Sequence, residues 1–404
     1  MRVLISGGGI AGLTLAYWLQ KSGISSVVIE RAKSIRRDGY AIDFFGTGYD
    51  VASRMSLIDR LAARQIPFEA IVYVNKDGKQ IARLDMRLLR SITEGKYLPL
   101  MHSTLEETLY EAIEGTVEVR LDSSLTQIVQ GRDEVIVTFH DGTTESFDLL
   151  IGADGVHSRT RTLVFGPEEQ FRHYLGYTIA CYPLADRYGI GRTYKLYNEP
   201  GRQVLAYGTN IEGELLVFFM YQSASPEHLP REQRLAHLRK VFAGMGWLTE
   251  QFLLDVNPAE NVFMDAVIQI QMPTWHLARV ALVGDACGCP TLLSGQGASL
   301  AMGGAYLLAR SLHETADQEE ALQRYEQQMR PHVLAQQKNG RSFAKSFLPG
   351  SPFGLFVQQT MMKVLLRPAF RWLLARSFGA QSILSAPESR SEPLSGSPES
   401  LLHR

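Results

Sequence analysis

The chain has 404 residues, of which 45% are hydrophobic and 21% charged, so it is long enough for two domains with separate cores. Its 41 Lys and Arg nearly balance its 42 Asp and Glu, which argues against nucleic acid or an anionic membrane as a partner held by net charge. Three cysteines are too few for a disulfide framework, and no metal-ligand spacing, signal peptide or membrane span is recognisable. We therefore expect a cytoplasmic protein that binds no metal and makes no contact with a membrane.

A glycine-rich turn follows the first predicted strand, Val3–Ser6, and precedes an apolar helical pattern. A second apolar run, Val27–Ile29, ends in an acidic residue about 20 positions further on, where a carboxylate can accept hydrogen bonds from ribose hydroxyls. Strand, glycine turn, helix and acidic strand end together predict a dinucleotide whose pyrophosphate lies at the helix N-terminus. The residues assigned to this site are Gly7, Gly9, Ile10, Ala11, Gly12, Glu30 and Arg31. The pattern does not distinguish FAD from NAD(P).

Two later strand ends carry similar signals. The run Asp148–Gly152 leads into Asp154 and Gly155, with Arg161 a few residues later. The run Arg279–Val283 leads into Gly284 and Asp285, and a helix rich in small residues then begins with Gly295, Gln296, Gly297 and Ala298. A carboxylate at a strand end can accept hydrogen bonds from ribityl or ribose hydroxyls, and a helix start rich in small residues lets N–H groups approach a ligand.

Taken in order, the three motifs resemble those of the para-hydroxybenzoate hydroxylase family of FAD monooxygenases, which includes aromatic hydroxylases, polyketide-tailoring hydroxylases and tetracycline-inactivating enzymes. The resemblance implies that Asp285 binds the ribityl chain of FAD and that Gly295 to Ala298 lie beside the isoalloxazine ring. It also implies that Asp154 and Gly155 serve both FAD and NAD(P)H. Arg161 occupies a matching place in the second motif.

The chain departs from the family pattern at two places. After Ala286 the family usually continues with Ala-His, whereas this chain has Cys287 and Gly288, and the loop runs on through Pro290 to Leu292. The family also often has an arginine at the start of the helix after the first crossover, where this chain has His102. Either His102 contacts FAD, or it merely caps the helix, although Ser103 or Thr104 could supply that cap without it.

The organisation expected is α/β: a Rossmann-like FAD-binding domain, a substrate domain on an antiparallel sheet, and C-terminal helices. The FAD-binding domain is predicted to be discontinuous and to consist of residues 1–75, 98–170 and 262–345. The substrate domain is predicted to consist of residues 76–97 and 171–261. A C-terminal helical segment, 346–385, and a disordered tail, 386–404, are expected to follow.

Aromatic side chains in the predicted antiparallel sheet are candidates for stacking on a planar substrate. They are Tyr194, Tyr207, Phe219 and Tyr221, and Pro290 of the altered loop is added as a substrate-binding residue. The alternative for each aromatic residue is that it fills the helix-covered face of the sheet.

No catalytic side chain is expected, because the reactive chemistry of such an enzyme belongs to its cofactor. The resemblance implies that NADPH or NADH reduces FAD transiently and that O2 forms a flavin C4a-hydroperoxide, which hydroxylates a small, aromatic or polyketide-like molecule. The alternatives are a halogenase or reductase on the same fold, or a flavin-binding protein without turnover. The oligomeric state is left open.

Overall fold

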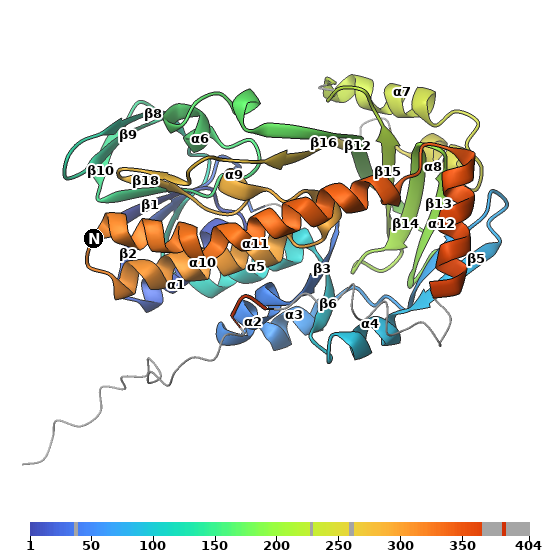
Figure 1. The fold of residues 1–404 in the computed structure, drawn as a ribbon, viewed down its shortest axis with the longest axis horizontal. Coiled ribbons are helices and arrows are strands. Elements are labelled where there is room, and N and C mark those ends of the chain that lie inside the picture. Colours follow the sequence, from blue (N-terminus) through green and yellow to red (C-terminus); the bar gives the residue numbers. More distant parts are fainter. Residues whose placement is uncertain (36–38, 227–228, 258–261, 366–381, 385–404) are drawn as a thin grey trace, which may run out of the picture.

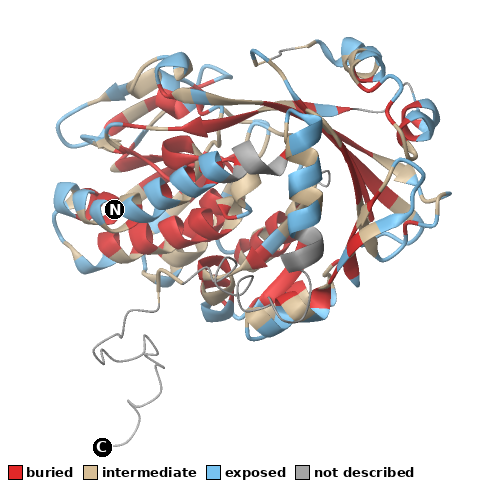
Figure 2. Ribbon diagram, turned by 45° about the vertical axis from the view of Figure 1, so that its right-hand side comes forward, coloured by how far each residue is buried: buried red, intermediate tan, exposed pale blue. Residues whose placement is uncertain are grey.

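A computed structural model describes residues 1–404 except 36–38, 227–228, 258–261, 366–381 and 385–404. Two large sheets organise the chain, and the long helix α11 (Gln318–Phe347) runs along both of them (Figure 1). Buried residues concentrate in the two sheets and in the helices packed on them (Figure 2). The fold is the mixed α/β arrangement that the sequence predicts.

The first sheet has six strands in the order β17-β18-β11-β1-β2-β7, parallel except for the β17–β18 pair. Its strands are β17 (His276–Leu277), β18 (Val280–Leu282), β11 (Leu149–Gly152), β1 (Arg2–Ser6), β2 (Ser25–Ile29) and β7 (Glu118–Arg120). Val3 and Ile5 pack toward the helices, whereas Leu4 packs toward a three-stranded sheet on the other face. Successive side chains of a strand point to opposite faces of the sheet, and because both faces are covered, the strands are apolar on both.

The helices on the first face are α1 (Ile10–Lys21), α5 (His102–Ile113) and α10 (Gly297–Glu314), with α2 (Thr47–Arg54) and α3 (Ile58–Ala63) beside them. The three-stranded sheet on the other face consists of β8 (Leu125–Gln130), β9 (Val135–Phe139) and β10 (Thr144–Phe147). Short elements complete this half: α6 (Arg159–Val164), the 3-10 turn Glu168–Gln170, α9 (Asp285–Gly288) and the 3-10 turn Leu292–Ser294.

The second sheet has seven strands in the order β16-β12-β15-β14-β13-β4-β5, antiparallel except for the β13–β4 pair. They are β16 (Phe263–Ile270), β12 (Arg172–Ala185), β15 (Glu214–Gln222), β14 (Arg202–Gly208), β13 (Thr193–Glu199), β4 (Ala70–Val74) and β5 (Gln80–Asp85). Helices α7 (Arg231–Val241) and α8 (Thr249–Asp255) cover one face, while α4 (Met86–Ile92) and α12 (Pro352–Leu365) lie near the β5 edge (Figure 1).

The other face of this second sheet is directed toward the first domain. A two-stranded ribbon, β3 (Ala41–Phe45) paired with β6 (Tyr97–Met101), lies between the two halves of the molecule. Residues of this ribbon pack with aromatic residues of the second sheet in one apolar cluster.

Two of the expected domain boundaries do not match the division of the strands between the two sheets. The first piece was expected to run to residue 75 and the last to begin at 262, yet β4 and β16 both belong to the seven-stranded sheet. The sequence could not reveal this because β4 pairs with β13, more than 100 residues away, with Ala70 opposite Thr193. The expected tail, 386–404, and residues 366–381 of the C-terminal segment lie outside the described residues.

Candidate cofactor and substrate site

The glycine turn between β1 and α1 is held by close backbone contacts. Gly7 has a φ of +118°, and a Cβ on it would lie 2.4 Å from the carbonyl oxygen of Ala153. A Cβ on Gly12 would lie 1.9 Å from the carbonyl oxygen of Gly7. Helix α1 carries no acidic residue in its first turn, so its N–H groups and positive dipole end are left for an anion.

Glu30 is fixed beside this turn. One carboxylate oxygen accepts a 2.9 Å hydrogen bond from the backbone N–H of Gly8, and the other accepts one of 2.8 Å from Ala32. The neighbouring Arg31 is exposed. The structure thus brings the acidic strand end to the glycine turn, as the dinucleotide pattern requires.

The second motif is a loop built around a half-buried carboxylate. Asp154 accepts hydrogen bonds from the Ser158 hydroxyl at 2.5 Å and from the backbone N–H of Thr160 at 2.8 Å. Burial nevertheless raises the pKa of Asp154. Gly155 has a φ of +77° and no atom within 4 Å of a Cβ position, so this side of the loop is open.

Arg161 joins the second motif to the third. Its guanidinium is fully buried and donates hydrogen bonds to the carbonyl oxygens of Val156 at 2.8 Å and Ala286 at 3.0 Å, and to Glu168 at 2.9 Å. Its protein partners therefore give Arg161 the role of fixing the loop after β11 against the loop after β18.

The third motif ends in a half-buried carboxylate. Gly284 has a φ of +67°, and Asp285 follows at the start of α9. Burial raises the pKa of Asp285, and His102 lies close enough for a positive charge on its ring to oppose that shift. The first helical residue of α5 is His102, and no side chain caps this helix. The capping explanation for this part of the sequence is therefore wrong.

The loop after α9 explains one departure from the family pattern. A Cβ on Gly288 would lie 2.6 Å from Cγ1 of Val333 on α11, so no side chain fits where the family has histidine. The Cys287 thiol points into the protein, toward the carbonyl oxygen of Gly284 and the Tyr325 hydroxyl. Pro290 is buried, and its carbonyl oxygen accepts a 2.9 Å hydrogen bond from Gln269.

The start of α10 differs from the start of α1. A Cβ on Gly295 or on Gly297 would have no atom within 4 Å, although Gln296 between them is buried. The neighbouring Thr291 is 1% exposed, and its hydroxyl has no hydrogen-bond partner among the residues that the structure describes. Asp285, Pro290 and Gly297 line one small hollow behind this loop.

The stacked pair Tyr194 and Tyr207 faces the first domain. Their ring centroids are 5.1 Å apart and the rings are within 4° of parallel, while Phe68 meets both rings edge-on. Leu292 and Leu293 of the loop before α10 belong to the same apolar cluster. The structure therefore brings the loop at the start of α10 and the two tyrosines together.

Two aromatic candidates lie on the opposite face. Phe219 and Tyr221 pack against Phe242 beneath α7 and α8, and the Tyr221 hydroxyl lies 3.0 Å from Nε2 of His237. The expectation that Phe219 and Tyr221 line the substrate pocket is therefore corrected. Alternation along β15 sends these odd-numbered residues away from the first domain.

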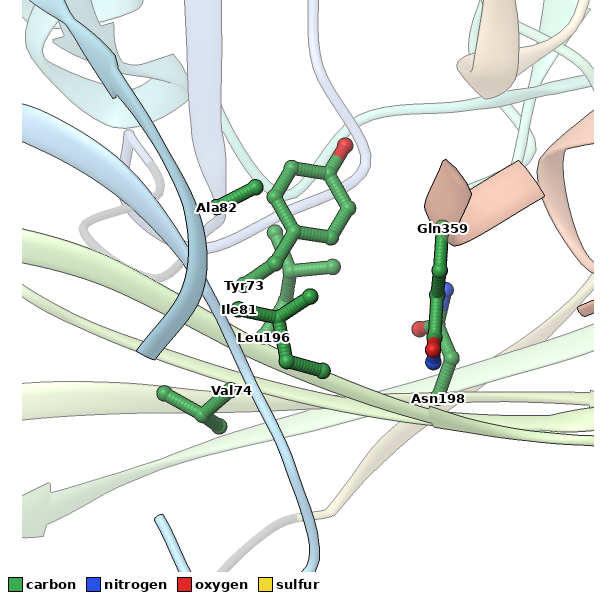
Figure 3. Close-up of a pocket in the computed structure, with 7 residues that line it drawn as sticks. All are labelled: Tyr73, Val74, Ile81, Ala82, Leu196, Asn198 and Gln359. Carbon is green, nitrogen blue, oxygen red and sulfur yellow. The ribbon is translucent and has the colours of Figure 1, made fainter. Parts of the chain in front are cut away.

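A further hollow lies on the same sheet face as Tyr194, near α12 (Figure 3). It is lined by Tyr73, Val74, Ile81, Ala82, Leu196, Asn198 and Gln359. Most of its lining is apolar, and Asn198 and Gln359 supply its amide groups (Figure 3).

Comparisons with known proteins agree with this geometry. A family model described as an FAD binding domain matches residues 1–339. A flavin-dependent monooxygenase from Legionella longbeachae is 31% identical over 355 residues, covering 86% of this chain and 90% of that protein. An uncharacterized protein of Mycobacterium tuberculosis, Rv1260, is 34% identical over 318 residues, covering 78% and 86%. The chain belongs to the FAD-dependent monooxygenases of the para-hydroxybenzoate hydroxylase family.

Solved structures of this family of monooxygenases share the whole fold. The tetracycline destructase Tet(55) superimposes with a TM-score of 0.81 at 28% identity, covering 94% of this chain and 97% of that chain. HpxO of Klebsiella pneumoniae, complexed with FAD and uric acid, gives a TM-score of 0.80 at 23% identity over 94% and 97% of the chains. At 23% identity, the similarity to HpxO shows only that the two proteins share a fold.

The region lined by the glycine turn at α1, the loop at Gly155 and the start of α10, which we call the cofactor groove, fits FAD. The closely packed glycines at the start of α1 let a pyrophosphate approach backbone N–H groups. At Gly155, Gly295 and Gly297 a Cβ would meet no atom, which leaves room for a group as broad as the isoalloxazine ring. The unpartnered Thr291 hydroxyl and the Asp285 carboxylate supply polar groups near that room.

Sequence reasoning missed two residues of this groove. Tyr40 lies with its ring centroid 5.9 Å from that of His102. Burial raises the pKa of its phenol, and the negative charges of Asp285 and Asp265 raise it further. Glu106 is buried on α5, with an oxygen 3.3 Å from a Cβ position on Gly9. Neither residue belongs to a motif, so no sequence signal indicated them.

Among the described residues, no helix is both long and apolar enough to cross a membrane. The same part of the chain contains no group of three or more side chains arranged to hold a metal ion.

Proposed function

We propose that this FAD monooxygenase uses NADPH or NADH and O2 to hydroxylate a small planar molecule of aromatic or polyketide-like type. The observation that carries the proposal is the open start of α10, whose loop packs in the same cluster as the stacked Tyr194 and Tyr207. A flat cofactor ring on one side and a flat aromatic wall on the other define a slot for a planar substrate.

The cofactor would be held along its length by the three motifs. Glu30 takes the adenosine ribose, the N–H groups at Gly9 to Gly12 take the pyrophosphate, and Asp285 accepts hydrogen bonds from the ribityl chain. The segment Gly295 to Ala298 lies beside the isoalloxazine ring. Bound FAD supplies the redox and oxygen-transfer chemistry, and the protein positions the substrate and excludes water.

The remaining predicted cofactor residues support these contacts. His102 lies near enough to Asp285 for a positive charge on its ring to favour the carboxylate. Asp154 and Gly155 form an open loop that FAD and the nicotinamide cofactor would share in turn, and Arg161 fixes that loop. The name of the Tet(55) relative supports a polycyclic substrate. The three cysteines are free and buried, which fits the reducing cytoplasm.

An absorption spectrum of the purified protein, followed by anaerobic addition of NADPH and then NADH, tests the proposal. Flavin bands that bleach faster when a polycyclic phenol is present, with label from ¹⁸O2 found in the product, are the expected result. Bleaching without incorporation of the label would indicate a reductase. Bands that never bleach would indicate a flavin-binding protein without turnover.

A further inference from the structure

The side chains of α12 are arranged the opposite way from those of an ordinary surface helix. Two of its polar residues face the protein: the Asn198 side chain donates a 3.4 Å hydrogen bond to the Gln358 amide oxygen, and Gln359 lines the same hollow as Asn198 (Figure 3). Four of its large apolar side chains face solvent instead. A surface helix normally buries its apolar side chains against the core and exposes its polar ones. The apolar side of α12 therefore fits a partner other than the sheet beside it.

The exposed apolar residues of α12 form one stripe. Phe353 is 76% exposed, Phe356 65%, Val357 46% and Met361 49%, and the two phenylalanines are the most exposed large apolar side chains of the described residues. Spacings of three and four residues place all four on one face of the helix, and we call them the α12 stripe. The helix stands at one end of the molecule beside β5 (Figure 1). An exposed apolar patch of this kind marks an interaction site.

The chain around the α12 stripe is basic. From residue 327 to residue 365, which includes most of α11 and all of α12, the sequence has five Lys or Arg residues and no Asp or Glu. Between residues 79 and 90, on β5 and α4, it has four exposed basic residues and one acidic residue, an excess of three positive charges. The four are Lys79, Arg83, Arg87 and Arg90. The whole chain has a net charge of −1, so its composition hides this local excess.

These charges decide between two possible partners. A second copy of the chain would bring the same positive charges against those of the first, and like charges repel. An anionic bilayer attracts basic residues and also takes up aromatic side chains at the boundary between headgroups and acyl chains. Composition argued against such a surface only because the charge was averaged over the whole chain.

We propose that α12 binds an anionic lipid surface and lies in the plane of the interface. The α12 stripe inserts at the boundary of the acyl chains, and the basic residues of β5 and α4 lie near the headgroups. The helix has 14 residues, too few to cross a bilayer, which agrees with contact from one side. This inference goes beyond the proposed function and does not rest on it.

Sedimentation with lipid vesicles tests the inference on the full-length protein saturated with FAD. Vesicles of phosphatidylcholine alone are compared with vesicles of equal parts phosphatidylcholine and phosphatidylglycerol. We expect the wild type to bind the mixed vesicles roughly tenfold more tightly or better, because several basic residues act together near the anionic surface. At about 1 M salt, where the Debye length falls to roughly 3 Å, this preference should disappear.

Variants of exposed residues locate the contact. Phe353→Ser combined with Phe356→Ser removes two rings of the α12 stripe and should weaken binding to the mixed vesicles by roughly a hundredfold. Met361→Gln should weaken it several-fold. Leu254→Ser is the matched control, since Leu254 is 64% exposed on α8, across the second sheet, and should leave binding unchanged. The thermal midpoint and flavin content of all these proteins should stay near those of the wild type, because the changed side chains are exposed.

Four results would overturn the inference. They are a wild type that sediments with neither kind of vesicle, equal binding to both kinds, a Leu254→Ser protein that loses as much binding as the double variant, and a lipid-free dimer that the double variant dissociates. The last result would show that a second copy covers the α12 stripe. Vesicle binding requires neither substrate nor turnover, so a protein that consumes no NAD(P)H but binds the mixed vesicles would contradict the proposed function alone.

Discussion

The two helix starts in the cofactor groove contain glycines for different reasons. At α1, Gly12 is required by the protein itself, because a Cβ would lie 1.9 Å from a backbone oxygen. At α10, a Cβ on Gly297 would meet no atom within 4 Å. Packing within the protein thus accounts for Gly12. It does not account for Gly297, which we attribute to the space that bound FAD requires. Packed and open positions should respond differently to substitution.

Gly12→Val should have the largest effect. The new side chain meets rigid backbone, so we expect a loss of more than about 5 kcal/mol in folding free energy, enough to prevent isolation of a folded protein. Soluble yield and the thermal midpoint without FAD are the measurements. A stable Gly12→Val protein that retains FAD would show that the turn is more adaptable than the packing indicates.

Phe219→Ala tests the packed face of the second sheet. The ring is fully buried beneath α7, so its removal should cost about 3 to 5 kcal/mol in denaturant unfolding. The dissociation constant for FAD, measured below the unfolding transition, should not change, because this face lies away from the groove. A large change in that constant would contradict the separation of the two faces.

Gly297→Val tests the open position. Since a Cβ at this position would meet no atom within 4 Å, the thermal midpoint of the FAD-free protein should stay the same or rise slightly as a helical glycine is replaced. Affinity for FAD should fall roughly tenfold or more, because the side chain takes space assigned to the ring. Unchanged affinity in a fluorescence titration would place the ring elsewhere.

Asp285→Ala should produce the smallest change in folding. Burial raises the pKa of this carboxyl, so its ionised form at neutral pH carries a cost in the folded state, and its removal should leave the FAD-free protein as stable or more stable. Retention of FAD should fall by about tenfold, because an acceptor for the ribityl chain is lost. A variant purified with full flavin content would refute the assignment.

Local patterns predicted much of the fold. The strand predicted at Val3–Ser6 lies within β1, and the apolar run Val27–Ile29 lies within β2. Alternation along β15 showed which residues share a face but not which face the helices cover, so Phe219 and Tyr221 were misplaced. Tyr40 and Glu106 were missed because neither belongs to a motif and only the folded chain brings them to His102 and Gly9.

The first sheet has a consequence for how the protein is made. Its central strands β1, β11 and β18 come from residues 2–6, 149–152 and 280–282, so neighbours in space are far apart in the chain. A ribosome must therefore synthesise 282 of the 404 residues before β18 can join, and the start of α10 emerges later still. Until then the first sheet is incomplete and its strand edges are unpaired. During this interval the N-terminal part of the chain is exposed to chaperones and to misassociation.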